Sequence, residues 1–210
     1  MSTTTKSAVI ETMYARTSVR KYDATYKMSK EELSAILTDA ITAPSTSNMQ
    51  PWRFLVITDE EAKQKLLPIA FNQKQIVDAS AIIAVQGDAN FHEKARQIHD
   101  LCKEAGFMTE EVAETQTQNS EKLYGGLPLE TRKAAAMYDA GLVSMQITLA
   151  AKDRGLDTVI MGGYNKPAFA EAFNLPENEF PIVLIAIGKS NGETNRGTAR
   201  LSVEDVARFI

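Results

Sequence analysis

Residues 41–57 read ITAPSTSNMQPWRFLVI and join the end of a predicted helix to a predicted buried strand. Pro44 cannot continue a helix, and Pro51 favours an extended conformation at Gln50. The backbone between the two prolines therefore has few partners in regular secondary structure. The polar side chains there can hydrogen-bond either that backbone or a ligand; they are Ser45, Ser47, Asn48 and Gln50. The stretch therefore predicts one of two structures. It is either a connecting loop whose side chains hydrogen-bond its own backbone, or a loop that binds a ligand.

The composition is ordinary for a globular chain. The 210 residues are 44% hydrophobic and 24% charged, with a formal net charge of −4. A chain of this length can bury roughly 70–75% of its unfolded surface, so we expect one domain spanning residues 1–210. The acidic balance argues against a nucleic-acid partner, which requires a basic face.

The cysteine count and the lengths of the apolar runs limit the cellular compartments in which the protein is expected. Cys102 is the single cysteine, which excludes an intrachain disulfide and a thiolate metal cage. The first residues lack the apolar core of a signal peptide, and no apolar run approaches the ~20 residues that span a bilayer. We therefore expect a cytoplasmic protein with no membrane partner.

Hydrophobic periodicity predicts alternating helices and strands. The helical patterns cover about 7–14, 29–43, 60–69, 91–104, 134–154 and 165–173, and the strand patterns cover 52–57, 80–86, 157–161 and 181–187. Ser29 and Glu32 have the spacing of a capping box, and Gly155 is expected to end the longest helix in the left-handed conformation. Residues 88–133 are more polar and less regular, which favours a mobile cover segment. The apolar residues of a C-terminal arm, 188–210, fit a segment that clasps a partner chain.

A second motif lies near the N-terminus, where Arg16, Ser18 and Arg20 alternate with other residues. In an extended segment the period of two places these three side chains on one side. Two guanidinium groups with a hydroxyl between them form a permanently charged receptor for a phosphate. A solvated basic face is the alternative interpretation.

Two further turns next to predicted strands carry amide side chains or glycines. Asn72 and Gln75 precede the strand pattern at 80–86, and Gly162 and Gly163 follow the one at 157–161. Paired glycines allow backbone N–H groups to approach a planar ligand closely. Solvent-facing amides and a simple tight turn are the alternatives.

Together these motifs resemble the FMN-dependent nitroreductase family. The resemblance rests mainly on two motifs, Pro-Ser-x-x-Asn-x-Gln-Pro-Trp-x-Phe at 44–54 and Arg-x-Ser-x-Arg at 16–20. The family's other positions follow in the same order and match Asn72, Gln75, Gly162, Gly163, Lys189 and Arg200. The resemblance implies an α+β, three-layer fold with a mainly antiparallel sheet flanked by helices. It also implies an intertwined homodimer with FMN at the interface.

The resemblance divides the matched residues into two roles. Those that would hold the phosphate and ribityl chain are Arg16, Ser18, Arg20, Lys189 and Arg200, with Arg196 as a rival to Arg200. Those that would surround the ring are Ser45, Asn48, Gln50, Asn72, Gln75, Gly162 and Gly163. Some relatives carry lysine where Gln75 stands. A positive charge near the reduced ring would stabilise it, and the neutral amide of Gln75 does not supply one. Arg20 is the alternative source of that charge.

The implied function is NAD(P)H-dependent reduction of nitroaromatics, quinones or similar electron-poor small molecules. Hydride passes through FMN in a ping-pong sequence, so the protein needs no catalytic side chain or metal of its own. A flavin-binding regulatory or storage module and another flavin reaction, such as dehalogenation or dehydrogenation, stay open. The preferred nicotinamide also stays open, because the sequence lacks a Gly-x-Gly-x-x-Gly fingerprint.

Overall fold

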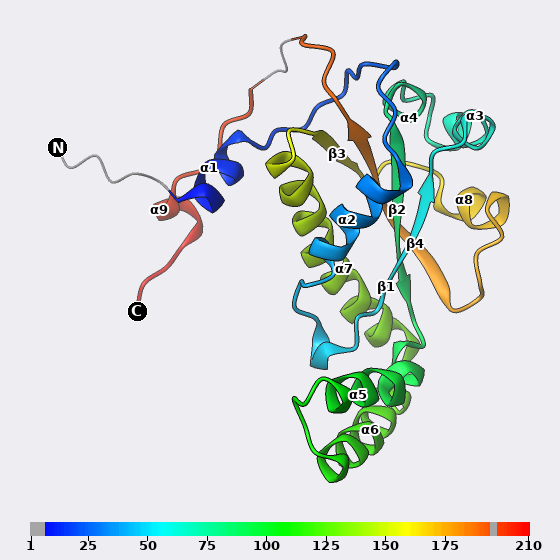
Figure 1. Ribbon diagram of the computed structural model, residues 1–210, viewed down its shortest axis with the longest axis vertical. Coiled ribbons are helices and arrows are strands. Elements are labelled where there is room, and N and C mark those ends of the chain that lie inside the picture. The colour runs from blue at the N-terminus through cyan, green and yellow to red at the C-terminus, as the bar shows by residue number, and fades with distance from the viewer. Residues whose placement is uncertain (1–6, 194–196) are drawn as a thin grey trace.

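One antiparallel sheet forms the centre of the molecule (Figure 1). The structure is a computed structural model, and it describes residues 7–193 and 197–210. In this part of the chain the sheet has four strands in the order β1-β2-β4-β3. The strands are β1 (Trp52–Ile57), β2 (Ala81–Asp88), β3 (Asp157–Met161) and β4 (Glu179–Gly188). All three pairings are antiparallel, and β2 is buried along its whole length. The predicted strand positions are confirmed.

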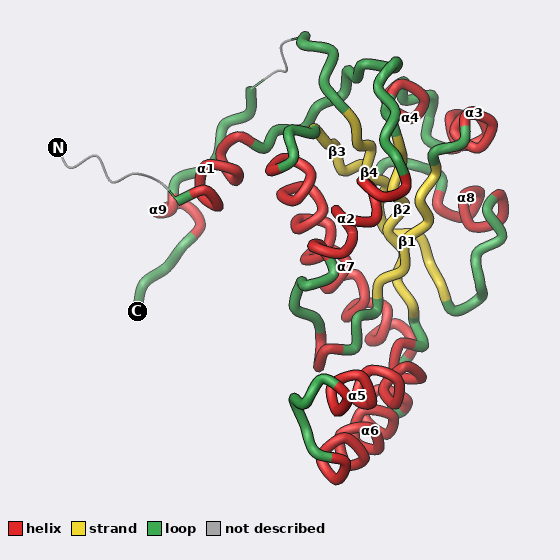
Figure 2. The backbone as a smooth tube through the Cα atoms, viewed as in Figure 1, coloured by secondary structure: helices red, strands yellow, loops and turns green. Residues whose placement is uncertain are grey.

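Helices cover both faces of the sheet (Figure 2). On one face lie α2 (Lys30–Ala40) and α7 (Leu129–Asp153), and on the other lie α3 (Glu60–Ile69), α4 (Gln75–Asp78) and α8 (Lys166–Ala172). Neighbouring residues of β2 point to opposite faces, so Ile83 joins the core under α7 whereas Ile82 joins the core under α8. The predicted three-layer α+β architecture is therefore confirmed.

Residues 88–133 are more regular than the sequence indicated. They form a short 3-10 turn, η2 (Phe91–Lys94), and then an antiparallel helical hairpin of α5 (Ala95–Glu104) and α6 (Glu110–Gly125) at one end of the molecule (Figure 1). The stripe that α6 buries consists of Ala113, Thr117, Ser120 and Tyr124. This spacing is helical, but three of its four residues are small or polar. The helix was missed because its stripe carries so little hydrophobicity.

Two terminal segments lie away from the sheet. The helix α1 (Ala8–Ala15) rests beside α7, and the short helix α9 (Val203–Val206) lies next to α1 (Figure 1). Neither helix contains a buried residue. The accessible surface of the chain is 12,532 Å². A compact monomer of this mass is expected to expose about 9,700 Å².

The helix ends follow from local signals. In the capping box of α2, Ser29 Oγ accepts from Glu32 N at 3.1 Å and Glu32 Oε2 accepts from Ser29 N at 2.7 Å. Gly155, just after α7, has a φ of +72°, as predicted for a left-handed cap. The helix α7 begins at Leu129, earlier than its apolar pattern suggested, because its first turn is polar. No helix in the described ranges is both long enough and apolar enough to cross a bilayer.

Two of the N-cap serines, Ser29 and Ser7, provide a matched test of these local signals. Ser29→Ala removes the side-chain oxygen that accepts from Glu32 N and leaves the backbone bond from Ser29 N to Glu32 in place. We therefore expect the free energy of unfolding to fall by about 0.5–2 kcal/mol. Ser7 precedes α1 but makes no side-chain capping bond. Ser7→Ala should therefore leave the unfolding free energy unchanged in urea titrations. Equal losses in the two variants would contradict the capping assignment.

Candidate functional site

The edge strand β3 receives the first group of predicted site residues. Val19 N donates to Thr158 O at 3.0 Å, and Ser18 forms a parallel bridge with Thr158. Residues 16–20 therefore run along the outer edge of β3 (Figure 1). Val19 points into the core and is 2% exposed, whereas Ser18 and Arg20 are exposed. Val19 is thus buried between two exposed neighbours, as an extended segment predicts, whereas Thr17, two residues before it, is exposed.

The amide turn at 72–75 meets the glycine turn at the end of β3. Gln73 Nε2 donates to Gly163 O at 2.9 Å, and Gln75 Nε2 donates to Met161 Sδ at 3.2 Å. Asn72 is exposed and left-handed, with a φ of +56°, while Gln75 is buried. The structure thus brings together Asn72, Gln75, Gly162 and Gly163. Gln73 joins the two turns, and no sequence pattern distinguished it from its neighbours.

This β3 group, which we define as residues 16–20, 72–75 and 162–163, is cationic and open. Within the described residues, no ion pair neutralises the guanidinium of Arg16 or Arg20. Gly162 and Gly163 are exposed, and a Cβ added to either would meet no heavy atom within 4 Å. Unpaired cations beside a bare stretch of backbone suit a ligand with an anionic end and a flat polar ring.

The remaining predicted cations contact other groups of the chain. The ammonium of Lys189 stands 4.4 Å from the centroid of the Tyr26 ring, although Lys189 O accepts from Asp23 N near the same edge. Arg200 belongs to the exposed C-terminal arm, where its Nη1 donates to Thr198 Oγ1 at 2.8 Å. Arg196 lies outside the described residues. The roles of these cations stay predictions.

The loop at residues 45–50 forms a second group, held in an unusual conformation. Ser47, Asn48 and Gln50 all have a left-handed backbone, with φ of 47°, 58° and 48°. Ser45 Oγ accepts from Gln50 N at 3.1 Å, and Gln50 Nε2 donates to Asn48 O at 3.3 Å. Left-handed conformations are strained for residues other than glycine, so neighbouring elements must hold this loop in place.

A buried aspartate of α7 holds the start of the 45–50 loop. Asp139 is fully buried, and its two carboxylate oxygens accept from Thr46 N at 2.9 Å and from Thr46 Oγ1 at 3.2 Å. Burial raises the pKa of Asp139, and the two Thr46 donors oppose that rise. Sequence reasoning missed Asp139. The available signal was a lone acidic residue inside a helix that is apolar nearly all round.

One chain does not bring the two groups together. The 45–50 loop leads into β1, which is the opposite edge of the sheet from β3. Three strand spacings separate these edges, which is about 14 Å at 4.7–4.9 Å per spacing. The loop instead contacts α5, α6 and α7 through Asn48, Ser47 and Thr46. The predicted site is therefore divided between two edges of the molecule.

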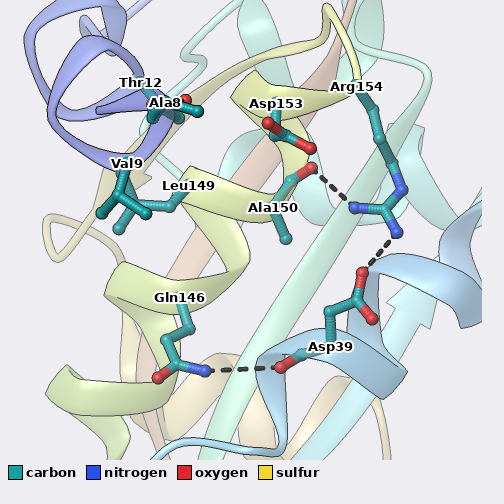
Figure 3. A pocket seen from close by; sticks show the side chains of 9 residues that line it. All are labelled: Ala8, Val9, Thr12, Asp39, Gln146, Leu149, Ala150, Asp153 and Arg154. Atoms are coloured by element: carbon teal, nitrogen blue, oxygen red, sulfur yellow. Dashed lines mark hydrogen bonds and ion pairs between the residues drawn. The ribbon is translucent and has the colours of Figure 1, made fainter. Parts of the chain in front are cut away.

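A cavity of about 360 Å³ lies elsewhere, between α1, α2 and α7 (Figure 3). Its apolar wall includes Val9, Leu149 and Ala150. On its rim, Arg154 forms an ion pair with Asp39 (Figure 3). None of the predicted site residues lines this cavity. It marks the place where α1 rests loosely on α7.

His99 links the two helices of the hairpin. His99 Nδ1 lies 3.0 Å from Thr117 Oγ1, which links α5 to α6, and burial lowers the pKa of His99. Among the described residues, no group of three or more His, Cys, Asp or Glu side chains is arranged to hold a metal ion. We assign no metal site.

Comparison with known proteins agrees with the fold and with the motifs. The model of the Nitroreductase family matches residues 13–189. YdgI of Bacillus subtilis, named as an NAD(P)H nitroreductase, is 41% identical over 202 residues, covering 95% of this chain and 96% of YdgI. The CLA biosynthesis enone reductase of Lactiplantibacillus plantarum is 32% identical over 203 residues, with 94% of each chain covered.

A solved structure extends the likeness to the whole fold. A crystal structure from Exiguobacterium sibiricum, described as a nitroreductase in complex with FMN, is 41% identical and superposes with a TM-score of 0.93. The match covers 100% of both chains. The family model and these relatives cover most of the chain. The protein therefore belongs to the Nitroreductase family, a family of oxidoreductases.

Proposed function

We propose that this protein is an FMN-dependent oxidoreductase that uses NAD(P)H to reduce nitroaromatics, quinones or similar electron-poor small molecules. The observation that carries the proposal is the β3 group. There, two unpaired guanidinium groups lie along a strand that ends in a bare glycine turn. The FMN complex of the Exiguobacterium relative supports the same cofactor here.

The residues of the β3 group fit the parts of FMN. Arg16, Ser18 and Arg20 would bind the phosphate and ribityl chain, because guanidinium groups and a hydroxyl match its oxygens. The backbone of Gly162 and Gly163 and the amides of Asn72 and Gln75 would hydrogen-bond the polar edges of the ring. Bound FMN would supply the hydride chemistry, accepting hydride from the nicotinamide and passing it to the acceptor.

Two copies of the chain complete the site in this proposal. The 45–50 loop lies on the sheet edge opposite the β3 group, so the loop of one protomer would reach the β3 group of its partner. One face of α7 exposes Met137, Tyr138, Gly141 and Met145, an apolar patch suited to a subunit interface. The C-terminal arm also exposes Leu201, Val203 and Phe209. We infer a homodimer in which these surfaces are covered.

A second candidate acceptor is an activated carbon–carbon double bond. The enone reductase relative from Lactiplantibacillus plantarum favours it, at 32% identity over nearly the full chain. The same hydride donor serves both reactions, so the difference lies in which acceptor fits beside the ring.

The phosphate assignment is tested by removing both guanidinium groups. Hydrogen bonds to charged groups contribute about 1.5–3 kcal/mol each, so Arg16→Ala/Arg20→Ala should weaken FMN binding at least 100-fold, on the order of two such bonds. Fluorescence titration of FMN and the FMN-to-protein ratio after purification measure the loss. Lys21→Ala is the control, because Lys21 lies in the same segment but pairs with Glu193. Tight FMN in the double variant would refute the assignment.

The reductase activity is tested anaerobically with NADH and with NADPH. A reductase should lose the visible absorption of its oxidised flavin rapidly with at least one of them, and should recover it when a nitroaromatic, a quinone or an enone is added. Stopped-flow absorbance measures both half-reactions. Flavin that stays oxidised with both nucleotides would instead indicate a storage or regulatory module.

The interface is tested at Gly141. A Cβ added there meets no heavy atom outside the helix's own backbone within 4 Å, and Gly141 is exposed, so Gly141→Arg should leave the protomer folded. We expect it to sediment as a monomer and to lose FMN, because a charged side chain would enter the apolar interface. Gln116→Arg on the exposed side of α6 is the control. An FMN-loaded dimer of Gly141→Arg would exclude this face as the interface.

A further inference from the structure

The part of the 45–50 loop with the greatest strain contacts the α5–α6 hairpin rather than the sheet. Asp139 holds only Thr46, at the start of the loop. The left-handed residues that follow, Ser47 and Asn48, face α6 and α5. Strained backbone persists only where its surroundings over-determine it, so the hairpin must supply part of that constraint.

The constraint at Ser47 is a short hydrogen bond between two hydroxyl groups. Ser47 Oγ lies 2.6 Å from Tyr124 Oη, and either atom can donate. Tyr124 is 7% exposed. Its ring packs edge-on against Phe91, with centroids 5.2 Å apart. The ring is thereby fixed, and its hydroxyl is presented to the loop at a defined position.

Met49, two residues after Ser47, anchors the loop in the same cluster. Met49 is fully buried and packs in a small core with Phe91, Ala95, Ile98 and Tyr124. This core is separate from the two that cover the sheet faces. Asn48 stands between these two attachments, and Gln50 follows them. The hairpin and the loop therefore form one packed unit, from which Asn48 projects exposed.

We propose that Tyr124 is a positioning residue: its hydroxyl holds Ser47, and through it Asn48 and Gln50, in the conformation that contacts the flavin. This inference rests on the proposed function for the identity of the ligand, but not for the loop geometry. It assigns the helical hairpin a role beyond covering a substrate. A shift of α6 would therefore move the loop residues together with it.

The experiment is a double-mutant cycle of Tyr124→Phe and Ser47→Ala. Tyr124→Phe keeps the ring packed on Phe91 and removes only the hydroxyl. Each single variant should weaken FMN binding about 2- to 10-fold, the range for one neutral hydrogen bond, and the double variant should be no worse than either single variant. The circular dichroism of the bound flavin's visible band should change alike in all three.

A second readout does not depend on FMN. In the apoprotein, amide hydrogen exchange of residues 45–50 should accelerate in each variant, while the strands keep their protection. Tyr26→Phe is the control, because its hydroxyl bonds Glu32 and lies on another element. Unchanged exchange in the loop, or additive effects on FMN affinity, would overturn the positioning role. Wild-type protein that binds no FMN would refute the proposed function instead, and the exchange data would still decide the role of Tyr124.

Discussion

The structure depends on the burial of the sheet's central strands on both faces. Every residue of β2 is buried, and β4 is buried along most of its length. Strands of this kind require helices on both sides, which α2 and α7 supply on one face and α3, α4 and α8 on the other. No face of the sheet is then left for a ligand. Polar residues that are available to a ligand therefore lie at the edges, on β3 and before β1.

The two edges are built in different ways. At β3 the proposed site consists of exposed backbone and unpaired cations, with little strain among its residues apart from Asn72. Before β1 the loop carries three left-handed residues other than glycine, which cost about 1–2 kcal/mol each. Asp139 and the small core around Tyr124 offset that cost. Stability in α7 and in the hairpin is therefore coupled to the shape of the loop.

The surface of the single chain is consistent with a site shared between two chains. The apolar face of α7, the helix α1 without buried residues and the exposed arm all lie outside the cores that the chain builds for itself. In the proposed dimer these surfaces pack together, and the same packing joins one β3 group to one loop. Folding, association and cofactor binding would then support one another thermodynamically.

The sequence by itself determined the family, the four strands and several of the helix ends. Prolines, the capping box at Ser29 and the left-handed Gly155 act within a few residues, so their effect is readable without the fold. The motifs at 16–20 and 44–54 indicated the chemistry in the same way. Only the tertiary structure decided that these motifs lie at opposite sheet edges, because strand order brings residues together independently of their spacing. It also revealed Gln73, Asp139 and Tyr124, whose partners lie 90, 93 and 77 residues away along the chain. Contacts over such separations depend on how the layers pack, and no local pattern records them.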